Sequence, residues 1–288
     1  MISWRKGATV RVANHEGRLV IVTADGAIDV ERASGGRFGP APMSAFDDWA
    51  AFRAWAETQS GTAAALDPSR LGPPVPSPRQ IFAVGLNYVR HAAESGLPLP
   101  ERPLVFTKFA SALTGPFGEV HLPSASVDWE VELVVVVGRE GRHVAAADAW
   151  GYVAGLTAGQ DFSDREVQSA GSPPQFSLGK SFPGFAPIGP YLVSVDEFAD
   201  PDDLRVTTTV DSEVKQDSRS SDLVFSVPYL VSYLSSIVTL LPGDLIFTGT
   251  PEGVGLGQTP PVYLRDGQVV QTTIETIGSM RHVMRASR

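Results

Sequence analysis

The feature of the sequence that most constrains the fold is an apolar run that opens with acidic residues, Asp128-Trp-Glu-Val-Glu-Leu-Val-Val-Val-Val-Gly138. Its aliphatic part, Leu133 to Val137, is uninterrupted and ends at a glycine, which predicts a strand buried on both faces. Because side chains alternate along a strand, Glu130 and Glu132 should point to the same side of it.

Two carboxylates on one face of a buried strand repel each other and lose hydration. A divalent cation would remove both problems. The alternative is a strand end at which the two acids simply face water, and the pair taken alone favours that alternative.

Composition narrows the possible functions. The chain has 288 residues, 43% of them hydrophobic, which suits one large domain or a main domain with a small appendage. A net charge of -9 and the lack of any basic run argue against a nucleic-acid partner. An anionic substrate is compatible with this charge, since a local cation can reverse the field in a cleft. The sequence contains no cysteine, which excludes disulfides, cysteine nucleophiles and cysteine-zinc sites.

The sequence offers no signal for export or membrane insertion. Residues 1–7 lack the apolar core of a signal peptide. The longest apolar-leaning stretch, Tyr229 to Leu241, is too short to cross a bilayer. We therefore expect a soluble, cytoplasmic protein with no membrane partner.

The chain divides into three parts. Residues 1–70 predict a small N-terminal α+β domain, 71–79 a stiff, proline-rich linker, and 80–288 the main domain. In the first part, 10–12 and 18–23 predict short strands joined by a turn at 16–17. A helix is expected from Ser44, with an apolar face formed by Phe46, Trp49, Phe52 and Trp55.

Strands dominate the main domain and helices are few. The expected strands are 80–85, 104–109, 119–122, 129–137, 191–195, 204–210, 244–248 and 269–277, and the expected helices are 88–95, 163–169 and 229–240. Regular alternation of strands and helices is absent, so the sequence predicts a strand-dominated α+β fold rather than a Rossmann or TIM architecture.

A second group of polar residues lies in the segment 160–168. If this segment opens a helix, Asp161, Arg165 and Gln168 lie on one face of it. Asp161 could then ligate a metal ion while Arg165 and Gln168 point at a shared substrate. Alternatively, Asp161 simply caps the helix.

A third group lies in Gly85-Leu-Asn-Tyr-Val-Arg-His-Ala-Ala-Glu-Ser-Gly96, where Asn87, His91 and Glu94 recur at helical spacing. A histidine whose orientation and pKa are set by a glutamate can serve as a general base. The alternative is a surface helix in which Arg90 and Glu94 form an ion pair.

Two glycine-rich segments complete the set. Lys180 lies in an expected irregular loop, 179–190, where it could stabilise an enolate or oxyanion or could simply be an exposed lysine. The segment 247–255 reads as a strand end that runs into a glycine-rich turn. Backbone N–H groups of this turn, or the Thr250 hydroxyl, could hold a carboxylate.

Each of these signals is weak alone, but their order resembles the fumarylacetoacetate hydrolase superfamily over about 74–277. The matching segments are Gly85-Leu-Asn-Tyr88 with His91 and Glu94, Pro103-Leu-Val-Phe-Thr-Lys108, Asp128-Trp-Glu-Val-Glu-Leu133, Asp161 with Arg165 and Gln168, Gly179-Lys-Ser-Phe182, Pro187-Ile-Gly-Pro190, Gln216, and Thr248-Gly-Thr-Pro-Glu-Gly-Val-Gly255. Within the family the chain is similar to the acylpyruvase-like and 2-hydroxyhepta-2,4-diene-1,7-dioate isomerase-like branches.

The resemblance implies a mixed β-roll catalytic domain, assembled as a homodimer, with a divalent metal ion held by Glu130, Glu132 and Asp161. An all-oxygen site suits Mg²⁺, with Mn²⁺ or Ca²⁺ also possible, rather than zinc. By the same resemblance, His91 and Glu94 form the acid/base pair on a helix that acts as a lid. Lys180 assists an oxyanion, and the residues that hold substrate are Arg165, Gln168, Gln216 and Thr250.

Four positions differ from the residues that are most frequent in the family. Gln160 stands where asparagine is frequent, and Asp164 where a small residue is usual. Leu86 occupies a position that is arginine in some acylpyruvate hydrolases, and 211–212 is Asp-Ser in place of Asn-Gly. None of the four is an expected metal ligand.

The expected activity is metal-dependent C–C bond hydrolysis of a 1,3-diketo acid, such as an acylpyruvate or fumarylpyruvate, to pyruvate and a carboxylic acid. Such an activity belongs to the catabolism of aromatic compounds. The same constellation also suits a decarboxylase, isomerase or hydratase of related keto acids, because the fold does not decide among them. A catalytically silent binding protein on this fold is the non-enzymatic alternative.

Overall fold

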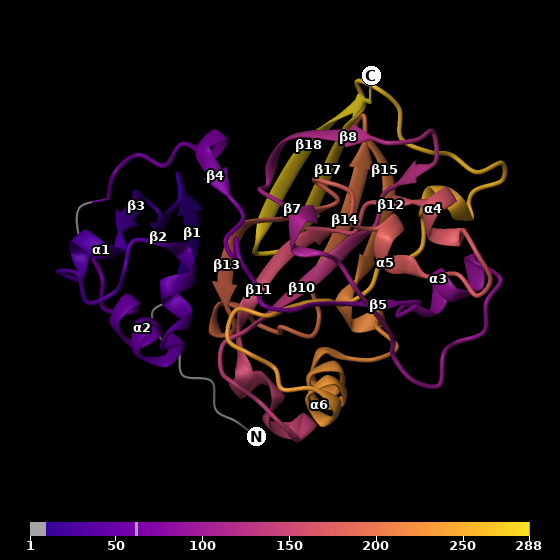
Figure 1. Ribbon diagram of the computed structural model, residues 1–288. Helices are drawn as coiled ribbons and strands as arrows, with labels where there is room; N and C mark the ends of the chain where they lie inside the picture. Colours follow the sequence, from indigo (N-terminus) through magenta and orange to yellow (C-terminus); the bar gives the residue numbers. More distant parts are fainter. Residues whose placement is uncertain (1–9, 61–62, 288) are drawn as a thin grey trace.

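The computed structural model describes residues 10–60 and 63–287. Residues 1–7, discussed above for the absence of a signal peptide, lie outside this range. The described chain folds as a strand-rich body with a smaller N-terminal unit at one side (Figure 1). No helix within the described ranges is long and apolar enough to cross a membrane.

The N-terminal unit is an antiparallel meander of β1 (Arg11–His15), β2 (Arg18–Thr23) and β3 (Gly26–Asp29), followed by the short helix α1 (Val30–Ala33). The first two strands and the turn between them were predicted. The third was not, because it is short and begins at a glycine.

The helix expected from Ser44 begins later than predicted. Residues 42–46 form a single 3-10 turn, and α2 (Trp49–Ala56) starts only after Asp48, whose side chain accepts a hydrogen bond from the Ala51 N–H. A proline that opens the 3-10 turn and a stronger capping residue at Asp48 explain the shift. The predicted apolar face is correct, since its aromatic rings pack together around the fully buried Phe52.

The N-terminal strands continue the sheet of the main domain. Strand β1 pairs with β13 (Ala186–Ser194) and also with β4 (Leu71–Gly72), which lies in the expected linker. The resulting sheet has the order β3-β2-β1-β13-β11-β10-β16-β5-β6, and the short β7 (Leu113–Thr114) pairs with β13 (Figure 1).

The centre of this sheet positions the acidic residues. Strand β10 (Val131–Val137) is buried along its whole length, as predicted, and pairs antiparallel with β11 (Val153–Gln160) and β16 (Leu245–Phe247). Beyond β16 lie β5 (Ile81–Gly85), paired in parallel, and the edge strand β6 (Leu104–Thr107).

A second, five-stranded sheet packs against the first. Its order is β15 (Glu213–Arg219), β14 (Arg205–Val210), β17 (Val269–Ile274), β18 (Gly278–Ala286) and β8 (Phe117–Leu122). Buried aliphatic residues from both sheets, such as Leu133, Leu156 and Ile274, form one core with helix α6 (Val227–Ile237). The strand-dominated α+β fold predicted from the sequence is therefore confirmed.

Several strands escaped prediction, and β11 is the instructive case. Its sequence is rich in glycine and alanine, which disfavour strands. The glycines are there because neighbours approach closely: a Cβ on Gly155 would lie 2.2 Å from the Val193 carbonyl oxygen, and one on Gly159 would lie 2.5 Å from a Val134 methyl group. Strands β15 and β18 were also missed.

The loop expected over 179–190 is wrong in its second half. Residues from Ala186 onward form β13 despite two prolines, which normally exclude a central strand. The pairing register between β11 and β13 shifts between Leu156 and Ala158, and this irregularity accommodates the proline-containing segment.

Candidate metal centre and active site

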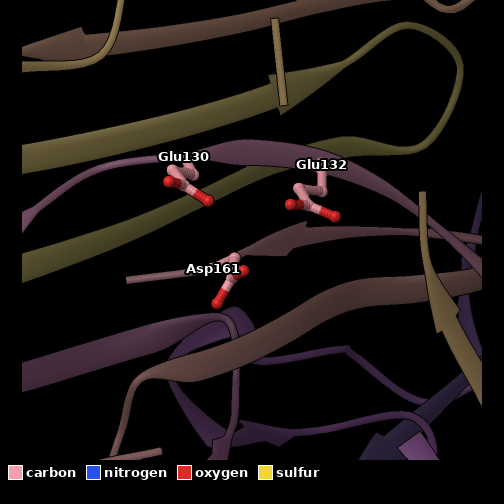
Figure 2. Close-up of side chains that lie close together, drawn as sticks. All are labelled: Glu130, Glu132 and Asp161. Carbon is pink, nitrogen blue, oxygen red and sulfur yellow. The ribbon is translucent and has the colours of Figure 1, made fainter. Parts of the chain in front are cut away.

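Three carboxylates meet where β10 and β11 begin and end. Glu130 immediately precedes β10, Glu132 lies within it, and Asp161 follows the last residue of β11. Their ligand oxygens all lie within 4.8 Å of one another, with Asp161 across from the two glutamates (Figure 2). The Asp161 N–H donates to the Glu130 carbonyl oxygen at 2.9 Å, which holds the two segments of backbone together at this point.

The cluster is buried: Glu130 is 4% exposed, Glu132 2% and Asp161 0%. Burial, together with the Asp161 and Glu130 carboxylates, raises the pKa of Glu132 well above its usual range. Burial also acts to raise the pKa of Glu130, but Lys180 and Arg165 outweigh it and lower that pKa to about 2.

The charge balance leaves Glu132 uncompensated. It accepts a hydrogen bond from the Gly249 N–H at 2.7 Å and forms no ion pair with any of the described residues. A converging set of three carboxylates, one of them without a cationic partner, fits a hard divalent cation such as Mg²⁺, Mn²⁺ or Ca²⁺. The solvated strand end considered from the sequence is ruled out by the burial.

Lys180 lies against the cluster, as expected for an oxyanion-stabilising residue rather than an exposed loop lysine. It follows the short helix α5 (Phe176–Gly179) and is 3% exposed. Its Nζ donates to Glu130 Oε2 at 2.5 Å and to Asp161 Oδ2 at 2.7 Å. Burial lowers the Lys180 pKa, but these carboxylates outweigh it and raise that pKa above its usual range.

Lys108 also belongs to the site, although the sequence predicted no role for it. Its side chain is wholly buried, and its Nζ donates to Asp161 Oδ1 at 2.5 Å and to the carbonyl oxygen of Lys180. Burial, followed by the Lys180 charge, lowers the Lys108 pKa. Its presence in a segment shared with the family was the one available signal, because no local spacing connects position 108 with position 161.

Arg165 and Gln168 do lie together, but Arg165 is fully engaged. Its Nε and Nη2 donate to Asp128 Oδ2 at 2.9 and 2.7 Å, and its Nη1 lies 2.7 Å from Glu130 Oε1 and donates to Gln168 Oε1 at 2.8 Å. This arrangement orients Glu130 and spreads positive charge behind it.

The prediction that Asp161 caps the following helix, or shares a face with Arg165, is wrong. Helix α4 (Arg165–Ser169) begins after the two-residue strand β12 (Ser163–Asp164), and its cap is Asp164, which accepts from the Val167 N–H at 3.0 Å. Pairing of β12 with β9 (Val127–Asp128) extends the chain between Asp161 and the helix. The residues converge through tertiary structure rather than helical spacing.

His91 and Glu94 lie on helix α3 (Val89–Glu94) and contact each other, His91 Nδ1 being 3.0 Å from Glu94 Oε1. The other Glu94 oxygen accepts from the Gly253 N–H at 2.9 Å. Arg90 lies 3.2 Å from Glu252, not Glu94, so the surface-helix alternative does not hold.

Asn87 anchors the start of this helix. Its side-chain amide donates to the carbonyl oxygens of Phe225 and Thr248 and accepts from the Phe225 N–H. The preceding Leu86 has a φ of 55°, a left-handed conformation uncommon for leucine, which turns the chain from β5 into the site.

Gln216 and Thr250 contact each other, but only Thr250 lines the cavity described below. The Gln216 amide donates to Thr250 Oγ1 at 2.7 Å and to the Pro251 carbonyl oxygen at 2.9 Å, and its Oε1 accepts from the Val131 N–H at 2.9 Å. Gln216 therefore joins the glycine-rich turn to the start of β10.

The departures from the family wording have structural roles. The Gln160 side chain accepts from the Glu130 N–H at 2.8 Å and donates to Thr208 at 2.9 Å, so it supports the first metal-site residue. Asp211 and Ser212 both have positive φ, 50° and 72°, and form the turn between β14 and β15.

These residues surround one cavity of about 660 Å³. Of the expected site residues, those that line it are His91, Glu94, Glu130, Glu132, Arg165, Gln168, Lys180 and Thr250. Asp161 and Gln216 lie behind the wall. A carboxylate cluster, a lysine and a histidine–glutamate pair in one cavity can bind an anionic oxo acid, move a proton and stabilise an enolate.

The fold and a buried carboxylate cluster that could hold a metal ion define the class of protein, and sequence comparison identifies the family. Residues 80–285 match the family model described as fumarylacetoacetate (FAA) hydrolase C-terminal. The chain belongs to the fumarylacetoacetate hydrolase family, whose members include hydrolases, isomerases and tautomerases.

Three relatives illustrate the range of proteins to which this chain is similar. Human oxaloacetate tautomerase FAHD2A, mitochondrial, is 46% identical over 207 residues, which cover 71% of this chain and 66% of that protein's length. The crystal structure of a Mycobacterium smegmatis protein provisionally described as HpcE is 50% identical, with a TM-score of 0.93 over 96% of this chain and 100% of the other. Maleylpyruvate hydrolase from Sphingobium sp. SYK-6, solved with manganese(II) and pyruvate, is 29% identical, with a TM-score of 0.81 over 96% and 100%.

Proposed function

We propose that this chain is a divalent-metal-dependent hydrolase acting on a 2,4-dioxo acid. It cleaves the bond between carbon 3, which lies between the two keto groups, and carbon 4, the distal carbonyl carbon. The products are pyruvate and a carboxylic acid. The observation that supports this proposal is that the His91–Glu94 pair faces the same cavity as the carboxylate cluster and Lys180.

Glu130, Glu132 and Asp161 would hold the metal ion, which we expect to be Mg²⁺, with Mn²⁺ or Ca²⁺ as substitutes. When bound, such an ion supplies Lewis-acid polarisation of the 2-keto group. Gln168 and Thr250 would contact the bound acid, while Arg165 and Gln216 would position the groups around it.

His91 performs the proton transfers. Its Nδ1 is engaged by Glu94, which leaves Nε2 to take a proton from water as that water attacks the distal carbonyl. The bond between carbons 3 and 4 of the acid then breaks, and its electron pair forms the enolate of pyruvate. The ammonium group of Lys180 stabilises this negative charge, and the proton held by His91 returns to carbon 3 to give pyruvate.

The test is product-resolved NMR of the purified protein with Mg²⁺ on acylpyruvates, oxaloacetate and a 2-hydroxy-dienedioate. We expect pyruvate plus a second carboxylic acid, lost on adding a chelator and in the Glu130→Ala and His91→Ala variants. Normal turnover by either variant would show that the proposed roles are wrong.

A second candidate is keto–enol tautomerisation of oxaloacetate, which the 46% identity to human oxaloacetate tautomerase favours. The same residues suffice, because His91 would take the proton from the enol oxygen on carbon 2 and deliver a proton to carbon 3, without attack by water. Loss of the enol's ultraviolet absorbance with no pyruvate formed would favour this activity. Carbon dioxide release or double-bond migration would instead indicate a decarboxylase or isomerase, water addition a hydratase, and the absence of metal binding a catalytically silent protein.

We further propose a homodimer, a small N-terminal domain at 1–70 and a role in aromatic catabolism. Light scattering, limited proteolysis and growth of a deletion strain on aromatic carbon sources test these three points. The cytoplasmic location expected from the sequence stays a prediction. The human relative carries the word mitochondrial in its name, and cell fractionation tests the location of this chain.

A further inference from the structure

The cavity has two chemically distinct parts. Its floor carries the buried charges of Glu130, Glu132 and Lys180, which are at most 4% exposed. Its remaining wall is mainly apolar, and two of its members are half exposed, Leu97 at 50% and Leu256 at 46%. The apolar lining residues include Leu86, Leu97, Phe106, Phe176 and Leu256, and uncharged polar residues such as Ser126 and Gln168 also line the cavity.

An aromatic wall connects the two parts. The Lys180 Nζ lies 5.3 Å from the centre of the Phe106 ring, and the Phe106 ring packs edge-to-face on Phe176 with centroids 5.7 Å apart. A substrate whose charged head lies at Lys180 would therefore extend its tail along aromatic side chains. Such surfaces bind alkyl and aryl groups through dispersion and removal of apolar area from water.

Every basic side chain among the described lining residues already has an acidic partner. Lys180 contacts Glu130 and Asp161, Arg165 contacts Asp128 and Glu130, and His91 contacts Glu94.

The rim adds an exposed acid, Glu166 on α4. A second carboxylate at the far end of a substrate would thus meet a negative charge, apolar side chains and uncharged polar groups such as Ser169. It would find no free cation among the described residues that line the cavity. Desolvation and like-charge repulsion both disfavour that arrangement.

We infer that this site selects 2,4-dioxo acids with an uncharged alkyl or aryl tail and discriminates against tails that end in a carboxylate. The inference rests on the proposed function for the head group of the substrate. It names the wall formed by Leu97, Phe106, Phe176 and Leu256 as the part that determines specificity.

The experiment compares two unbranched 2,4-dioxo acids of equal chain length, one ending in a methyl group and one in a carboxylate. We expect kcat/KM for pyruvate formation to favour the methyl-ended acid by about tenfold or more, the range that a single group in an apolar pocket can provide. Equal values, or a preference for the carboxylate, would overturn the inference while leaving the hydrolase proposal intact.

Binding separates the two proposals further. Kd values for both acids are measured by calorimetry with Mg²⁺ present. If neither acid yields pyruvate but the methyl-ended acid binds about tenfold more tightly, C–C hydrolysis is wrong and the tail preference stands. Equal affinities, or no binding of either acid, would overturn the tail preference as well.

A matched pair of variants tests the assignment of the wall. Leu97→Arg places a cation at the rim of the cavity. The control, Leu99→Arg, places a cation at a nearby position whose side chain is 46% exposed and does not line the cavity. We expect the first to raise kcat/KM for the carboxylate-ended acid by about tenfold, roughly the effect of one new charge-assisted hydrogen bond. The second should change nothing, and equal effects of the two variants would contradict the assignment.

Discussion

Replacing Asp128 with asparagine tests how the site is held together. The Asp128 side chain is fully buried, and its two oxygens accept five hydrogen bonds. One oxygen accepts from the backbone N–H groups of Trp129 and Gly255, at 2.8 and 2.7 Å. The other accepts from the Leu256 N–H at 2.9 Å and from two nitrogens of Arg165. Asp128 thus joins β9, the glycine-rich turn and α4 around the carboxylate cluster.

The magnitude follows from these contacts. Asparagine keeps the side-chain volume but replaces one acceptor oxygen with an NH₂ group, which only donates. Whichever way the amide turns, at least two of the five N–H groups that now bond to Asp128 lose their acceptor. Each buried donor left unsatisfied costs about 1–3 kcal/mol. Removing one partner of a buried ion pair costs roughly 3–5 kcal/mol. Because the two figures describe overlapping losses, we expect Asp128→Asn to lower the free energy of unfolding by about 3–5 kcal/mol.

The assay is urea unfolding followed by circular dichroism, with Asp217→Asn as the control. Asp217 accepts two hydrogen bonds from Arg205, at 2.8 and 2.7 Å, but the side chains are 41% and 60% exposed. Water screens this pair, so its loss should change stability far less. If the two variants lost similar stability, the argument that Asp128 organises the site would be refuted.

Three further outcomes are expected. Lys108→Met should lower kcat by about a hundredfold with the circular dichroism spectrum unchanged, because the lysine orients two residues of the site. Glu94→Gln should lower kcat roughly a hundredfold with little change in KM, because His91 loses the charge that sets its orientation. Burial lowers the pKa of His282 to about 4, against a hydrogen bond to the Gly115 carbonyl that opposes the shift. As pH falls, His282 therefore takes up a proton in the unfolded chain before it does so in the folded protein. The free energy of unfolding should fall by about 3 kcal/mol between pH 6.5 and about 4 for this reason. Urea titrations at several pH values should show that His282→Phe removes this dependence.

Each of these expectations can fail in a recognisable way. Unchanged kcat in Lys108→Met would make that lysine a purely structural residue. A Glu94→Gln variant that retains full activity would remove the general-base assignment of His91. A His282→Phe protein with the same pH dependence as the wild type would show that another group controls the acid response.

The sequence by itself determined the local parts of the site. The two-residue period of a strand places Glu130 and Glu132 on the same side, and the uninterrupted aliphatic run after them required the strand to be buried. Helical spacing likewise brought His91 and Glu94 together. Both inferences were correct because each depends only on backbone geometry over a few residues.

Tertiary structure decided which distant residues complete the site. Asp161 reaches the glutamates because β11 pairs with β10. Strand β11 was not predicted, because its glycines lower its strand propensity and are there only to allow the close approach of neighbouring residues. Lys108 and Lys180 are far apart in sequence and meet only through Asp161 and a backbone carbonyl. Periodicity encodes direction along one element. Contacts between elements depend on sheet order and packing, and a single sequence carries no local signal for either.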